Sequence, residues 1–120
     1  MTLLSDGGVH SHIDQLKAVL DVFKGKGIEL FLHAVMDGRD TPKTNGVNYI
    51  DQIEAHGGFT FASVQGRSIG MDRDRRWEKI KHAYDTMTGK GEKSELSAKD
   101  YVQAEYDKDI YDEFITPALL

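Results

Sequence analysis

Residues that could bind a small anion are grouped in three short segments of the sequence. They are Asp6, Gly7, Gly8, His10 and His12 in the first segment, Asp37, Arg39 and Asp40 in the second, and Arg67, Asp72 and Arg73 in the third. Arginine and histidine donate charge-assisted hydrogen bonds to phosphate or carboxylate, and glycine lets backbone N–H groups approach a ligand. Together the segments predict a small anionic substrate. Asp40, next to Arg39, can remain ionised through that neighbour and act as a base toward a substrate hydroxyl.

Two other functions fit parts of this pattern. Asp6, His10 and His12 could be the ligands of a metal-dependent hydrolase, because His-x-His after a strand is a common metal-binding arrangement. The arginines of the second and third segments oppose a dication, which weakens that interpretation. A non-catalytic module that only binds an anion is the other alternative. Each segment taken alone is also typical of a solvated turn.

The elements that must position these segments alternate along the chain. Strands are expected at 2–4, 28–36 and 59–64, and apolar stripes of helical spacing predict helices at 13–23, 47–54 and 77–87, with a short helix from 97 to 104. Ser11 with Asp14 predicts the start of the first helix, and Ser97 with Asp100 that of the last. Asp72 and Asp74 are expected in the first turn of the third helix. The tail from 105 to 120 carries no clear pattern.

This alternation predicts an α/β fold, a layered, open and mostly parallel sheet with flanking helices. In such sheets ligands bind at the carboxyl ends of the strands, where each of the three segments begins. Trp77 is expected in the core. A sheet of three strands with a short first strand would expose apolar edges, so we expect an incomplete domain.

Composition restricts the class of protein. The chain has 120 residues, 39% hydrophobic and 29% charged, which suits one small domain. Without cysteine it can form neither disulfides nor thiolate metal sites. A net charge of −5 and a pI near 5.4 disfavour nonspecific binding to nucleic acid or an acidic membrane. With neither a run of about 18 apolar residues nor a secretory signal, we expect a cytoplasmic protein.

Several separated motifs resemble cofactor-independent phosphoglycerate mutases. They are Leu3–His12, His33–Pro42, Gly66-Arg67 with Met71–Trp77, Ala83-Tyr84 and Asp112–Phe114, in the order and at the separations of that family. The resemblance implies a glycolytic and gluconeogenic isomerase that interconverts 3-phosphoglycerate and 2-phosphoglycerate through a phosphoserine intermediate. In these enzymes a phosphatase-like domain holds the serine and two manganese ions, and an inserted domain binds the substrate. The parent enzyme is expected to be a monomer.

Carried onto this sequence, the resemblance makes residues 1–120 part of the substrate-binding domain. It assigns substrate binding to His10, Arg39, Asp40, Arg67 and Arg73, with Asp40 as acid and base. The metals belong to the phosphatase-like domain, which is absent here, so no residue of this chain is expected to bind metal and the chain alone is expected to be inactive. The same argument reassigns Asp6 and His12 to loop structure. Ser68-Ile69-Gly70 departs from the two aromatic residues and alanine usual in the family.

Overall fold

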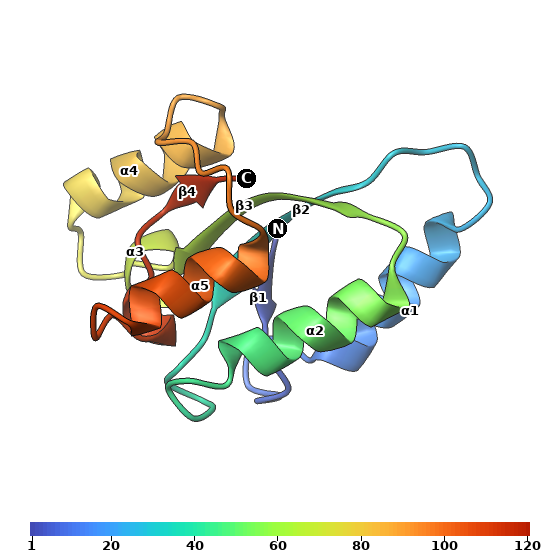
Figure 1. Ribbon diagram of the computed structural model, residues 1–120, viewed down its shortest axis with the longest axis horizontal. Helices are drawn as coiled ribbons and strands as arrows, with labels where there is room; N and C mark the ends of the chain where they lie inside the picture. Colours follow the sequence, from blue (N-terminus) through green and yellow to red (C-terminus); the bar gives the residue numbers. More distant parts are fainter.

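A four-stranded sheet organises the chain, and the computed structural model describes all of residues 1–120 (Figure 1). The elements in chain order are β1 (Thr2–Leu4), α1 (Ile13–Phe23), β2 (Phe31–Met36), α2 (Gly46–His56), β3 (Thr60–Gly66), α3 (Arg67–Gly70), α4 (Trp77–Met87), α5 (Ala98–Tyr106), the 3-10 helix η1 (Asp112–Phe114) and β4 (Ala118–Leu119). No helix is long and apolar enough to cross a membrane.

The sheet confirms the predicted fold class and adds one strand to it. Its order is β1-β2-β3-β4; β1, β2 and β3 are parallel, and β4 runs antiparallel to β3. Leu4 pairs with Met36, and Met36 pairs with Gly66, so the three parallel strands end at the same edge. The short β4 lies in the tail that the sequence left unassigned. It was not predicted because two residues are too few to show an alternating pattern.

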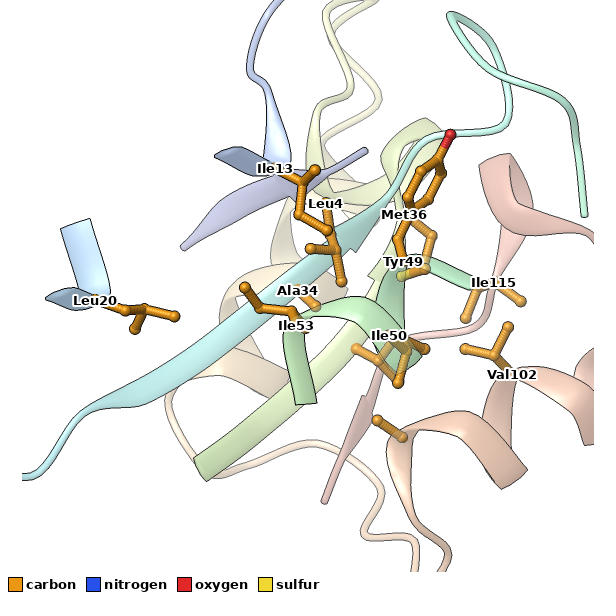
Figure 2. Packing of buried hydrophobic residues seen from close by; sticks show 12 residues of the cluster. Leu4, Ile13, Leu20, Ala34, Met36, Tyr49, Ile50, Ile53, Val102 and Ile115 are labelled. Atoms are coloured by element: carbon orange, nitrogen blue, oxygen red, sulfur yellow. The ribbon is translucent and has the colours of Figure 1, made fainter. Parts of the chain in front are cut away.

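The hydrophobic core lies between the sheet and the helices α1, α2 and α5. Figure 1 shows α2 and α5 crossing in front of the strands, whereas α4 lies next to β4 and contacts β3 and β4. Leu4, Ile50, Ile53 and Ile115 are fully buried and meet in this cluster (Figure 2). Truncating one such isoleucine to alanine typically costs about 2–5 kcal/mol. Tyr49 points its hydroxyl out of the cluster and donates a hydrogen bond to Asp6, which fixes the first loop to α2.

Helix starts were predicted with mixed success. The backbone N–H of Asp14 is capped by the His12 ring at 3.1 Å, not by Ser11, whose hydroxyl donates to the carbonyl of Leu3 instead. The predicted cap of α5 is confirmed, because Ser97 Oγ accepts from the backbone N–H of Asp100 at 3.1 Å.

One strand is shorter than predicted, and two aspartates expected in the first turn of a helix lie before it. The strand β2 begins at Phe31, not at residue 28, and Phe31 itself is exposed because no helix covers that end of the strand. Asp72 and Asp74 precede α4, which begins at Trp77. Trp77 is 70% exposed, so its expected place in the core is wrong. The buried residues of α4 are Ala83 and Thr86, while Tyr84 of the apolar stripe is exposed.

Candidate functional site

Each parallel strand ends in a loop that carries polar side chains to one edge of the sheet. The first loop follows Leu4, the second follows Met36, and β3 passes at Gly66 directly into the short helix α3. Because the strands are parallel and in register, the three segments predicted from the sequence converge. A fourth segment, 111–115, joins them from the C-terminal part of the chain.

Asp37 is the centre of the polar network at this edge. Its side chain is 1% exposed. Ser5 Oγ donates to it at 2.6 Å, and the backbone N–H groups of Arg39 and Asp40 donate at 3.2 and 3.0 Å. Burial raises the pKa of Asp37, but the hydrogen bonds from Ser5, the Asp40 backbone and Arg67 outweigh it, so the pKa lies below its usual value. Asp37 is therefore ionised and holds the turn that carries Arg39 and Asp40.

Arg67 connects the second loop to the third. Its Nη1 donates to Asp37 Oδ1 and to Asp40 Oδ2, both at 2.7 Å, and the side chain is 11% exposed. Asp40 is therefore paired with Arg67 and not, as the sequence suggested, with the adjacent Arg39. Consecutive side chains diverge in the turn, and Arg39 lies instead 3.8 Å from Glu113 Oε1. The Nε and Nη2 groups of Arg67 make no hydrogen bond within the chain.

A cleft of about 120 Å³ opens beside this network. It is lined by four of the predicted site residues, His10, Arg39, Arg67 and Arg73. Asp40 is not among the residues that line the cleft; it is bonded to Arg67, which does line it, and is partly exposed. Sites for drug-sized ligands occupy roughly 300–1,000 Å³, so this cleft suits a small metabolite.

The third loop contains arginines with and without a carboxylate partner. Arg76 donates to Asp72 at 3.1 Å and to Asp74 at 3.0 Å, which also fixes the approach to α4. Arg73 is exposed and has no carboxylate partner within 4 Å, so its guanidinium is available to a ligand. Arg76 directly precedes α4 and lines the cleft.

Sequence reasoning did not assign Glu113 to the site, although its carboxylate lines the cleft. Asp112 was also missed. It is fully buried, accepts a hydrogen bond from the backbone N–H of Gly46 at 2.8 Å and another from the Tyr106 hydroxyl, and burial raises its pKa to about 6. Only the motif Asp112–Phe114 drew attention to this segment, because no local pattern reveals that residues so distant in sequence meet the three loops.

The predicted metal ligands do not assemble. Asp6 accepts from Tyr49, His12 caps α1, and His10 lines the arginine cleft. No group of three His, Cys, Asp or Glu side chains in the chain could hold a metal ion. The residues present therefore do not fit a metal centre.

A larger hollow, of about 310 Å³, lies away from the charged residues. It is bounded by α1 and the beginning of β2, with Leu16, Phe23 and Phe31 among a mainly apolar lining. Its lining contains no arginine or lysine, so we regard the smaller arginine cleft as the candidate functional site.

The sheet and the arginine cleft at the carboxyl ends of its strands define an α/β domain with a candidate site for an anion. The whole chain, residues 1–120, matches the family model described as BPG-independent PGAM N-terminus (iPGM_N), and the chain belongs to this family.

Relatives agree with this assignment. The chain is 46% identical to a 2,3-bisphosphoglycerate-independent phosphoglycerate mutase of Picosynechococcus, covering 98% of this chain and 23% of that protein. It is 47% identical to the protein of the same name from Synechocystis, again over 23% of its length. A crystal structure of Leishmania mexicana phosphoglycerate mutase at low cobalt concentration superimposes with a TM-score of 0.87 at 29% identity, covering 98% of this chain and 24% of that one. The chain thus spans about a quarter of the length of its relatives.

Proposed function

We propose that this chain forms the substrate-binding part of an isomerase that interconverts 3-phosphoglycerate and 2-phosphoglycerate through a phosphoserine intermediate. The observation that carries the proposal is the cleft in which Arg39, Arg67 and Arg73 meet at the carboxyl ends of the parallel strands. A phosphoglycerate carries a phosphate and a carboxylate, and arginine binds both groups through paired N–H donors. Membership in the family supports this choice of substrate over other small anions.

Within this proposal the arginines and His10 bind the anionic groups of the substrate. Arg73 is free of carboxylate partners, and Arg39 has only a long contact with Glu113. Arg67 keeps two unoccupied donor groups, Nε and Nη2, while its Nη1 is anchored on Asp37 and Asp40. This anchor orients the guanidinium before the substrate arrives, which reduces the entropy lost on binding.

Asp40 is the proposed acid and base toward the glycerate hydroxyls. A base must be ionised, reachable and held in place. Arg67 holds the Asp40 carboxylate in place at 2.7 Å, and the Asp40 side chain is 20% exposed, so a ligand bound beside Arg67 can reach it. Asp40 thus accepts a proton from one hydroxyl and can return it to the other.

The serine nucleophile and the metal ions are proposed to come from residues outside this chain. In the parent enzyme these would be two manganese ions, and no cluster of this chain fits them. The chain by itself would then bind substrate without turnover. We further propose that the parent enzyme is a cytoplasmic monomer.

Two neighbouring arginines offer a matched test of substrate binding. Titration of the isotope-labelled chain with 3-phosphoglycerate, followed by NMR, should shift the three loops with a Kd of about 1 mM, near −4 kcal/mol. Arg73→Gln should weaken binding about tenfold, because it removes a free cation from the cleft. Arg75→Gln removes the same charge outside the cleft and should change little. Asp40→Asn should leave binding largely intact, since Asp40 is assigned to proton transfer.

An assay coupled to enolase tests the second half of the proposal. We expect no conversion of 3-phosphoglycerate by the chain alone. Chemical shifts absent from the three loops would remove the claim of substrate binding, and measurable turnover would contradict the assignment of the nucleophile to residues outside the chain.

A further inference from the structure

The 3-10 helix η1 places one carboxylate among the arginines of the cleft. Two glycines make this approach possible. A Cβ at Gly38 would lie 2.7 Å from the backbone N of Glu113, and a Cβ at Gly66 would lie 2.6 Å from its carbonyl carbon, so only glycine permits contact at both positions. Gly66 also donates its N–H to the carbonyl of Ile115 at 2.8 Å. The backbone of Glu113 is therefore fixed against the two loops that carry Arg39 and Arg67.

Among the carboxylates that line the cleft, Glu113 is the one without a hydrogen bond. Asp72 and Asp74 are both bonded to Arg76, at 3.1 and 3.0 Å. Glu113 has only the contact of 3.8 Å with Arg39, beyond hydrogen-bond distance, and its side chain is 24% exposed. Its oxygens are thus free to accept a hydrogen bond from a ligand.

A carboxylate in an anion site has two opposite effects. It repels a ligand that offers only negative oxygens, and an ionised carboxylate can only accept hydrogen bonds. A ligand with a hydroxyl group beside its anionic groups can donate a hydrogen bond to this carboxylate, which offsets part of the electrostatic repulsion. Rejection of ligands that cannot donate is a general way to obtain specificity.

We propose that Glu113 determines specificity in this cleft, by requiring a hydroxyl donor on the anionic ligand. The inference rests on the proposed function, because it takes the ligand to be a phosphoglycerate. Glu113 accepts the hydrogen bond of the single glycerate hydroxyl in the bound complex, and Asp40 takes that proton only when the phosphoryl group moves, while Arg39 and its neighbours hold the anionic groups. A phosphorylated carboxylic acid that lacks the hydroxyl meets the same arginines but leaves Glu113 unpaired and repulsive.

The test compares 3-phosphoglycerate with 3-phosphooxypropanoate, which has the same anionic groups and lacks only the hydroxyl. The dissociation constants are measured by NMR titration of the 120-residue chain. We expect the wild-type chain to prefer the hydroxylated ligand about tenfold, the usual effect of one charge-assisted hydrogen bond. In Glu113→Gln the preference should fall to about threefold or less, and in Glu113→Ala to about one, since a neutral bond is weaker and alanine makes none.

Glu29→Gln is the matched control, because it removes the same charge before β2, at the end of the sheet opposite the cleft. It should preserve the wild-type preference. The amide spectrum of each variant shows that the fold is retained. An unchanged preference in both Glu113 variants would overturn the role of Glu113 while leaving the proposed function intact. Failure of both ligands to shift the cleft residues of the wild-type chain would overturn the proposed function itself.

Discussion

Replacement of Arg67 by methionine tests the polar network on which the cleft is built. The substitution keeps an unbranched side chain about as long as the aliphatic part of arginine and removes both contacts of 2.7 Å, one to Asp37 and one to Asp40. Removing one member of a buried ion pair usually costs about 3–5 kcal/mol, because the other charge remains buried without its partner. Asp37 retains three other hydrogen-bond donors, Ser5 Oγ and two backbone N–H groups. We therefore expect a loss near the lower end, about 3 kcal/mol of the free energy of unfolding at pH 7.

The pH dependence of this loss is the sharper part of the prediction. In the wild-type chain the pKa of Asp37 lies below its unfolded value, so its stabilising contribution is present at neutral pH and is lost as the pH falls through the lowered pKa. Without Arg67 the pKa of Asp37 rises, and protonation relieves the unpaired charge. The difference between Arg67→Met and wild type should thus narrow as the pH falls below about 4.

Urea unfolding followed by circular dichroism at pH 7 and at pH 3.5 measures both effects. Arg75→Met is the control, since Arg75 makes no ion pair within 4 Å and should change stability by less than about 0.5 kcal/mol. A loss below about 1 kcal/mol in Arg67→Met, or a loss of equal size at both pH values, would refute the role given to the Asp37 network.

Two further substitutions and one metal titration test other parts of the site. Asp112→Asn should raise stability at pH 8 by about 2 kcal/mol, because burial raises the pKa of Asp112 to about 6 and the ionised form is costly. This gain should vanish toward pH 4, where the wild-type carboxyl is protonated; a constant difference in urea unfolding would contradict it. Gly66→Ala should weaken binding of 3-phosphoglycerate and destabilise the chain by about 1–3 kcal/mol, because its Cβ would collide with the backbone of Glu113; NMR titration and urea unfolding measure the two effects, and a variant as stable as the wild-type chain would contradict the close contact. Calorimetric titration with manganese should show no micromolar binding, and stoichiometric binding lost in His10→Ala would instead favour the metal-dependent hydrolase.

The sequence predicted the parallel strands and the three loops because strong local signals mark them. Nearly continuous apolar runs end abruptly in glycine and charged residues, as at Met36 before Asp37, and such boundaries depend on near neighbours alone. The shared edge followed from the rule that parallel strands present their carboxyl ends together. His10, Arg39, Arg67 and Arg73 were therefore brought to one cleft by local patterns and topology.

The pairing of charges within the site could not be predicted in this way. Asp40 bonds to Arg67, a residue 27 positions away, while the adjacent Arg39 turns toward Glu113. Loop geometry and burial determine these charge partners, and the spacing of residues along the sequence does not predict them. Trp77 shows the same limit, because an apolar stripe predicts a buried face only where another element covers it, and none covers the start of α4.

The balance of charges explains why the cleft should bind its ligand weakly on its own. Four arginines, at positions 39, 67, 73 and 76, stand among five carboxylates, at positions 37, 40, 72, 74 and 113, so the site has no excess of positive charge. Attraction then comes from directed hydrogen bonds of unoccupied N–H groups, such as those of Arg73, and not from a long-range positive field. We therefore expect the millimolar affinity for 3-phosphoglycerate to fall less than about threefold between 50 and 200 mM salt, because short contacts are screened little. A steeper dependence, measured by the same NMR titration, would mean that a general electrostatic field dominates and that the individual donors matter less than their summed charge.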